Sequence, residues 1–171
     1  PAQQVIGVVE QIISGDIRNV YGVRSAWLRP LQDRFPSATL LHHITPLLRG
    51  LVLQSRKPDH DVMVCCQLRG KLMDLVIFQE GKLHYCNSFS FANSEELTYY
   101  ILFVLDQLSL NPTKQHVVFL GIGKDDHALV NYCGSFLGDT TIGFGEEMDY
   151  RCRPSPPFPS QRYFNLTSLR L

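Results

Sequence analysis

Three apolar runs separated by two-residue turns constrain the fold of this chain more than any other feature. Asp61–Leu68 is almost continuously apolar, as expected for a strand that is buried on both faces. The pairs Arg69-Gly70 and Glu80-Gly81 separate this run from Lys71–Gln79 and Lys82–Phe91. Short turns that end in glycine between apolar runs are typical of β-hairpins. The segment therefore predicts a three-stranded antiparallel meander.

Side chains of the third strand are expected to alternate between the two faces of the sheet. One face would carry Leu83, Tyr85, Phe89 and Phe91, and the other His84, Cys86, Ser88 and Ser90. Asn87 interrupts the apolar face. We expect it to be buried with its amide bonded to backbone near the sheet edge.

A helix, a strand and a second helix are predicted after the meander. Asn93 caps the first helix and Glu96 follows three residues later. Its apolar face carries Leu97, Tyr100, Ile101, Val104, Leu105 and Leu108, and Asn111-Pro112 ends it. His116–Leu120 is a buried strand, and Gly121-Ile122-Gly123 is a tight turn. A helix over Lys124–Leu137 would direct Ala128, Leu129, Tyr132, Cys133 and Phe136 inward, before a last strand at Thr140–Phe144.

The N-terminal part of the chain gives weaker signals. Residues 4–13 fit a helix or a strand, and Ile17–Arg24 is a strand. Ser25 can cap a helix that runs to Phe35, but a proline inside a helix loses a hydrogen bond, so Pro30 favours a later start. Thr39–His43 predicts a short strand. Thr45-Pro46 predicts a cap and first helical residue for a helix to about Gln54, followed by a polar linker over residues 56–60. The proline-rich residues 154–159 exclude regular structure, and residues 162–169 fit a helix or a strand.

Composition excludes several classes of protein. Lys plus Arg and Asp plus Glu both number 16, so a nucleic-acid binder that works by bulk positive charge is not expected. No apolar run approaches about 18 residues and no secretory leader is visible, so we expect a cytoplasmic protein without a membrane partner. The five cysteines form no Cys-x-x-Cys pair. Most are expected to be reduced and buried, and Cys65 and Cys66 should point to opposite faces of their strand.

From residue 61 the predicted order is β-β-β-α-β-α-β. This order is that of the ribonuclease-H-like fold, an α/β (α+β) fold with a mixed sheet that also forms each half of actin-like ATPases. A dinucleotide-binding fold would alternate strand and helix from its first strand.

Lys82–Pro112 also resembles an uncharacterised bacterial family that is assigned an actin-like fold. The features shared with it are Asn87-Ser88-Phe89 at a strand end, the polar cap, the Tyr99-Tyr100 helix and an exit at Gln107-Leu108 before Pro112. Phe35–His43 is similar to the segment upstream, and the resemblance covers about residues 17–140. It implies that residues 1–55 are the tail of a first actin-like half that begins upstream, and that residues 61–171 are the second half.

The resemblance directs attention to the first hairpin of this half, where actin-like ATPases hold phosphate with an Asp on the strand and a Gly in the turn. The matching residues here are Gln67, Arg69, Gly70 and Lys71, and no Asp is present. The turn at Gly121 and Gly123 matches an adenosine-contacting junction. However, Asp125 and Asp126 follow it, and their charges would repel phosphate. These six residues are the candidate nucleotide-binding set, with the solvated turn as the competing interpretation.

Other chemistries find little support in the sequence. A ribonuclease-H-type nuclease needs several carboxylates around two metal ions. Val62–Leu68 of the first strand has none, the second strand has Asp74, and the helix has Glu95 and Glu96 at its start, which does not reproduce such a cluster. His42 and His43 are adjacent, so on a strand they would diverge, one packed and one exposed, and no metal site is expected. Neither a Walker A loop nor a Gly-x-Ser-x-Gly elbow occurs.

We therefore expect a degenerate actin-like protein that binds or scaffolds another protein without catalysis and without a cofactor. One alternative is a weak nucleotide binder or ATPase that takes ATP and Mg²⁺. Another is a structural module that forms homodimers through the edge of the meander or the proline-rich segment. Tyr99, which lies off the apolar stripe of its helix, is a residue that can face a partner.

Overall fold

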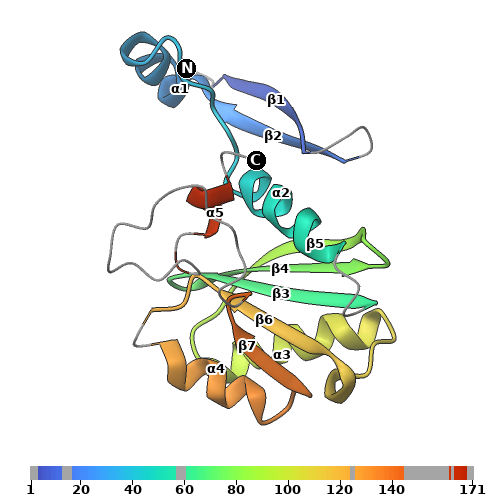
Figure 1. Ribbon diagram of the computed structural model, residues 1–171. Helices are drawn as coiled ribbons and strands as arrows, with labels where there is room; N and C mark the ends of the chain where they lie inside the picture. Colours follow the sequence, from blue (N-terminus) through green and yellow to red (C-terminus); the bar gives the residue numbers. More distant parts are fainter. Residues whose placement is uncertain are drawn as a thin grey trace.

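The structure is a computed structural model that describes residues 4–12, 17–56, 61–123, 126–144, 162 and 164–168. Within these residues the elements are, in chain order, β1 (Val5–Gln11), β2 (Arg18–Arg24), α1 (Ser25–Arg34), α2 (Ile44–Ser55), β3 (Val62–Arg69), β4 (Leu72–Gln79), β5 (Lys82–Ser90), α3 (Ser94–Gln107), the 3₁₀ turn η1 (Pro112–Lys114), β6 (His116–Leu120), α4 (His127–Gly134), β7 (Asp139–Ile142) and α5 (Phe164–Thr167). Figure 1 shows a small upper part made of β1, β2 and α1, and a larger lower part built on one sheet.

The larger part is a five-stranded mixed sheet with the strand order β5-β4-β3-β6-β7. The meander β3-β4-β5 is antiparallel, and β6 pairs parallel to β3 and to β7. The predicted order β-β-β-α-β-α-β is therefore confirmed. The first turn is at Gly70 and Lys71, one residue later than predicted, because β3 continues through Arg69.

Helices cover both faces of the sheet. On one face, α3 and α4 pack on a core that contains Cys66, Leu75 and Phe119. On the other face, α2 and Phe164 of α5 pack on a core that contains Cys65 and Val76. Cys65 and Cys66 thus point to opposite faces, as the strand periodicity predicts. Cys133 is also buried, whereas Cys86 on the edge strand β5 is exposed.

The predicted alternation along β5 is wrong at one point. The pairing between β4 and β5 shifts between Ile77 and Phe78, as at a β-bulge. Leu83 consequently packs in the core on the α2 side of the sheet, whereas Tyr85 and Phe89 pack on the α3 side. Asn87 is exposed rather than buried, and its Oδ1 accepts a hydrogen bond from the backbone N–H of Ser88 at 2.9 Å.

The cap of α3 is confirmed, since Asn93 Oδ1 accepts from the backbone N–H of Glu96 at 2.9 Å. The predicted face of α4 is wrong in part. Val130 and Cys133 are buried, but Ala128 and Phe136 are exposed. The helix ends at Gly134, so Phe136 lies in the turn beyond it.

The N-terminal part departs most from prediction. α1 begins at Ser25, not near Pro30, and Arg24 rather than Ser25 is its N-cap residue. The Ala26 carbonyl that the proline leaves without a donor belongs to an exposed residue, so water can satisfy it. Residues 39–42 form no regular strand, and α2 starts at Ile44 with His43 as its N-cap.

Side chains of α2 hold the β1-β2 hairpin to the rest of the molecule. Arg49 donates from Nε to the Ile12 carbonyl at 3.1 Å and from Nη2 to the Gln11 carbonyl at 3.2 Å. Thr45, predicted as a helix cap, instead accepts a hydrogen bond from Asn19 of β2 at 3.2 Å. Ile12 itself is buried in the core beside α2.

None of the helices in the described ranges combines the length and the apolarity needed to cross a membrane. Residues 57–60 of the predicted linker, Cys152 and the proline-rich residues 154–159 lie outside the described residues. Within residues 162–169, the open choice between helix and strand resolves as the short helix α5.

Candidate functional site

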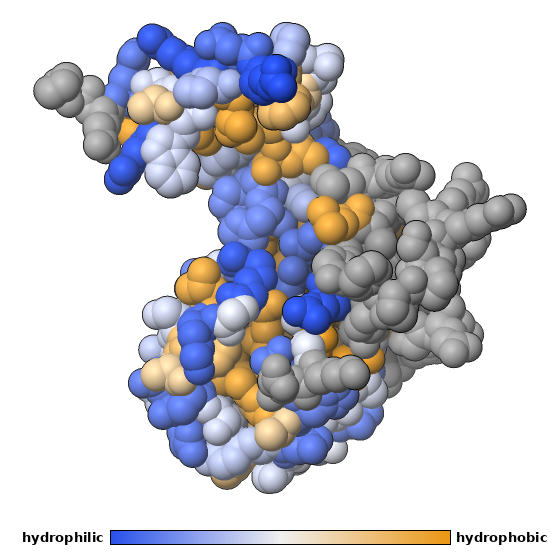
Figure 2. All heavy atoms as spheres, turned by 90° about the vertical axis from the view of Figure 1, so that its left-hand side faces the viewer, coloured by the Kyte–Doolittle hydropathy of each residue, from blue (hydrophilic) through white to orange (hydrophobic). Residues whose placement is uncertain are grey.

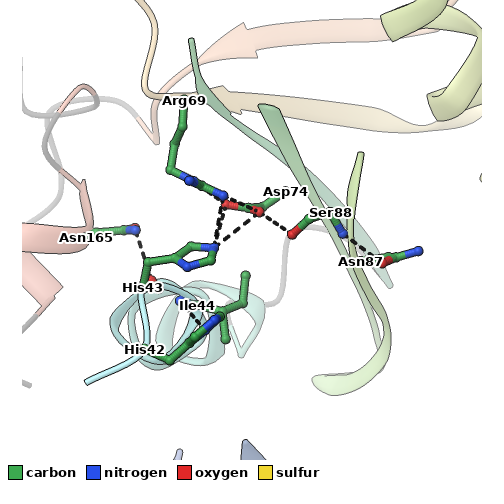
Figure 3. A network of polar contacts seen from close by, with 8 residues as sticks. All are labelled: His42, His43, Ile44, Arg69, Asp74, Asn87, Ser88 and Asn165. Atoms are coloured by element: carbon green, nitrogen blue, oxygen red, sulfur yellow. Dashed lines mark hydrogen bonds and ion pairs between the residues drawn. The ribbon is translucent and has the colours of Figure 1, made fainter. Parts of the chain in front are cut away.

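A buried carboxylate lies at the centre of the meander. Asp74 on β4 pairs in register with Gln67 of β3 on one side and with Ser88 of β5 on the other. Its side chain is fully buried, and Arg69 donates to it twice, from Nε at 2.8 Å and from Nη2 at 3.0 Å. Ser88 Oγ donates a third hydrogen bond at 2.6 Å. Figure 3 shows these groups converging from the three strands.

His43 brings the N-terminus of α2 to the same place. Its Nε2 lies 3.0 Å from Arg69 Nη2 and 3.5 Å from the Asp74 carboxylate. A guanidinium can only donate, so the shorter contact requires Nε2 to accept and places the ring proton on Nδ1. The His43 carbonyl accepts a hydrogen bond from Asn165 of α5 at 3.1 Å. Five elements therefore meet around Asp74.

These contacts determine the charge states of Asp74 and Arg69. Burial alone would raise the pKa of Asp74, but the hydrogen bonds from Arg69 and Ser88 and the charge of Arg69 outweigh it and hold the pKa well below its usual range. The hydrogen bond to Asp74 raises the pKa of Arg69 in turn. Asp74 and Arg69 therefore both stay charged near neutral pH, and their opposite charges compensate each other.

A second polar cluster continues from His43 to the β1-β2 hairpin. The carboxylate of Glu10 accepts the backbone N–H of His42 at 2.9 Å and the hydroxyl of Tyr21. His42 Nδ1 accepts from the backbone N–H of Ile44 at 3.3 Å. Burial, and then the hydrogen bond to Glu10, raise the pKa of Tyr21 to about 12.

The expected divergence of the two histidines is wrong. They lie in the turn before α2 rather than on a strand, and their ring centroids are 4.3 Å apart. Both side chains are half-buried. Within the described residues, no group of three or more His, Cys, Asp and Glu side chains is placed to hold a metal ion.

The residues predicted from the first hairpin are present at one end of the sheet, but most are already engaged. Arg69 is bound to Asp74. Lys71 Nζ donates to the Ala92 carbonyl at 2.7 Å and lies 5.7 Å from the centre of the Phe91 ring. Gln67 is only 5% exposed, and its Oε1 has no hydrogen-bond partner among the residues that the structure describes. Gly70 adopts a φ of 63° in the turn, with open space around it.

The second predicted loop reaches the same end of the sheet because β3 and β6 are parallel neighbours. Gly121 has a φ of 75°, and a Cβ there would lie 2.1 Å from the Leu68 carbonyl oxygen. The backbone N–H of Gly123 donates to Asp126 Oδ2 at 2.8 Å. Gly121 therefore serves a close backbone contact, and the amide of Gly123 is occupied by a carboxylate of its own chain.

His43, Asp74 and Ser88 were not among the predicted site residues. Asp74 carried a usable signal, because it is the one charged residue in the apolar strand Leu72–Phe78 and a buried charge needs a partner. Ser88 follows from the register of the meander. His43 could not be found this way, because its position depends on how α2 packs on the sheet.

A comparison with solved structures identifies the fold of this chain. The chain is similar to a crystal structure from Bacteroides thetaiotaomicron, described as a protein with an actin-like ATPase fold and unknown function. The TM-score is 0.73 with 22% sequence identity, over 84% of this chain and 55% of that one. The chain therefore has the actin-like ATPase fold and spans about half the length of this structure. No curated protein matches it.

The fold expected from the order of elements is thus confirmed by the architecture and by this similarity. A family model described as "Protein of unknown function (DUF3822)" matches residues 3–138, which is most of the chain. The chain accordingly belongs to the DUF3822 family.

Proposed function

We propose that this chain is a non-catalytic binding or scaffold protein that keeps the actin-like fold without turning over nucleotide. The observation that carries the proposal is the double hydrogen bond between Arg69 and the buried Asp74. Asp74 and His43 engage three of the five N–H donors of Arg69, and a guanidinium that turned away to bind a phosphate with the same edge would leave Asp74 buried and uncompensated.

The remaining groups of the hairpin and the second loop support the same proposal. Gln67 replaces the carboxylate that would orient Mg²⁺ or its waters, and an amide offers no negative charge to a cation. At the second loop, Asp126 occupies the Gly123 amide that an anion would need. An incoming phosphate would therefore meet a carboxylate rather than a free donor.

The division of the chain forms part of the proposal. Residues 1–55 would complete a first actin-like half, residues 56–60 a linker and residues 61–171 the second half. Support comes from the separate β1-β2 sheet and from the 55% coverage of the similar structure. The fold would then present surfaces to another protein.

Calorimetric titration of the full chain with Mg-ATP tests the proposal, together with an assay for phosphate release. We expect no saturable heat and no phosphate release above the buffer rate, while circular dichroism shows a folded protein. A saturable signal that disappears in Arg69→Ala, but persists in the surface control Lys114→Ala, would overturn it. That result would establish the nucleotide-binding alternative built on Gln67, Arg69, Gly70, Lys71, Gly121 and Gly123.

A further inference from the structure

An exposed stripe on α1 combines apolar and basic side chains. Trp27 is 70% exposed and Leu31 is 52% exposed, and their spacing of four residues places them on one face of the helix. Arg34 follows Leu31 by three residues, and Arg24, the last residue of β2 and the N-cap of α1, comes three residues before Trp27. Leu28 is buried on a different side of α1. We call Arg24, Trp27, Leu31 and Arg34 the α1 stripe.

A stripe of opposite charge lies on α3. Tyr99 is 60% exposed and Phe103 is 46% exposed, and their rings stack with centroids 5.9 Å apart. Glu95 precedes Tyr99 by four residues and Asp106 follows Phe103 by three, and both are exposed. Glu95 accepts one hydrogen bond, from the hydroxyl of its neighbour Ser94 at 3.3 Å. We call Glu95, Tyr99, Phe103 and Asp106 the α3 stripe.

The apolar pairs of the two stripes have the same spacing, and the charged residues that flank them are opposite in sign. Each has an apolar pair four residues apart, with one charged residue beyond each end, basic on α1 and acidic on α3. Charge is segregated along the whole chain in the same sense. Residues 1–60 hold seven Lys and Arg against four Asp and Glu, whereas residues 61–171 hold nine against twelve. Complementary charges around an apolar centre are the pattern of a specific interface.

The stripes cannot meet within one molecule. Figure 1 places α1 at the far end beyond the β1-β2 hairpin, whereas α3 lies under the opposite face of the five-stranded sheet. Figure 2 shows apolar atoms gathered in the upper part of the molecule with hydrophilic atoms around them. Arg24 and Arg34 have no ion-pair partner among the described residues, so both charges face solvent.

We propose that this chain self-associates by packing the α1 stripe of one molecule against the α3 stripe of a second copy. The contact joins two different surfaces of the chain. Made twice about a two-fold axis it closes a dimer, and made once per molecule it gives a head-to-tail assembly. This inference deepens the proposed function, because it names the partner as a second copy of the chain.

Sedimentation velocity over a concentration series tests the association, with the fluorescence of Trp27 as a second readout. Trp27 is the only tryptophan of the sequence, so its emission reports on the α1 stripe directly. We expect the sedimentation coefficient to rise with concentration, the Trp27 emission to shift to the blue, and added salt to reverse both changes. A chain that stays monomeric at the highest concentration, with unchanged emission, overturns the proposal.

Charge reversal tests the surface itself. The double variants R24E/R34E and E95R/D106R each place like charges at the contact, so each alone should associate at least about tenfold more weakly than the native chain. An equimolar mixture of the two should recover association, because each variant then meets a partner of opposite charge. The matched control is Arg29→Glu, an exposed change on the opposite side of α1 from Trp27.

Circular dichroism verifies that each variant is folded. Equal association of the double variants and the control, or no recovery in the mixture, overturns the proposed surface. All of these measurements omit nucleotide. A failure here is therefore distinguishable from a failure of the proposed function, which would appear as Mg-ATP binding in the calorimeter.

Discussion

Asp74 is a fully buried charged residue, so its stability depends on the hydrogen bonds and the positive charge that its neighbours supply. Replacing Asp74 by Asn removes the negative charge that compensates Arg69. It also places the side-chain NH2 group of Asn among Arg69 and Ser88, which are themselves hydrogen-bond donors. We expect Asp74→Asn to lower the free energy of unfolding by about 3 kcal/mol, as when one partner of a buried ion pair is removed. Urea denaturation measures this change.

The matched control for this variant is Ser88→Ala. It removes a single hydrogen bond from the same carboxylate and leaves the ion pair intact, so it should cost about 1 kcal/mol. Equal losses in the two variants would show that the charge pair contributes nothing beyond one hydrogen bond.

His42 makes stability depend on pH. Burial, and then the neighbouring His43, lower the pKa of His42 below its ordinary value of 6.5. Below pH 6.5 the unfolded chain therefore binds a proton that the folded chain does not. Stability should be full above this pH, fall as the pH drops through it, and level off below the folded-state pKa.

The variant His42→Asn tests this origin of the pH dependence, since its Oδ1 can replace Nδ1 as the acceptor for Ile44 without titrating. Urea denaturation at pH 7 and pH 5 should show a smaller loss of stability for the variant than for the native chain. An unchanged loss would assign the pH dependence to other groups.

Only part of the polar network could be predicted from single residues. Arg69 stands out beside a glycine turn, but its engagement with Asp74 depends on the register of β3 and β4. The contact with His43 depends further on the docking of α2, which is set by long-range packing rather than by the local pattern. The proximity of His42 and His43 has the same origin.

At the scale of elements, the junction between β6 and α4 is controlled by one close backbone contact. Gly121→Ala would place a Cβ against the Leu68 carbonyl at a positive φ, so we expect a loss of about 2 kcal/mol or more. Gly70→Ala also has a positive φ but open space around it, so it should cost about 1 kcal/mol. Similar losses in thermal or urea denaturation would exclude a role for the Leu68 contact.

Elements with strong local signals were predicted, and those that depend on neighbours were not. The meander and the capped helix α3 follow from turns, periodicity and Asn93. The bulge at Ile77 and Phe78 leaves no mark in the alternation of β5, so Leu83 was assigned to the wrong face. The predicted start of α1 near Pro30 is wrong, because the free-energy cost of a proline inside a helix depends on whether water can reach the carbonyl that loses its hydrogen bond.

For the whole molecule, the two parts differ in how they are held together. The β1-β2 hairpin is a two-stranded sheet with Val5, Val9 and Val20 exposed, and isolated hairpins are marginally stable. We expect its backbone amides to exchange hydrogen at least about tenfold faster than those of β3 and β4. Exchange followed by mass spectrometry measures this difference.

Arg49 provides the control for this expectation. Its guanidinium binds two carbonyls at the end of the hairpin, so Arg49→Ala should speed exchange in β1 and β2 and leave β3 and β4 unchanged. Equal protection of the hairpin and the sheet in the native chain would contradict the two-part description.

The adjacent Cys65 and Cys66 on the central strand have a practical consequence. Burial raises the pKa of both thiols, so neither reacts while its layer is closed. Cys65 reports on the layer under α2 and Cys66 on the layer under α3 and α4. Pulsed alkylation therefore times the opening of each layer separately: equal rates would mean that the sheet loses both coverings in one cooperative event, and unequal rates would identify the layer that detaches first.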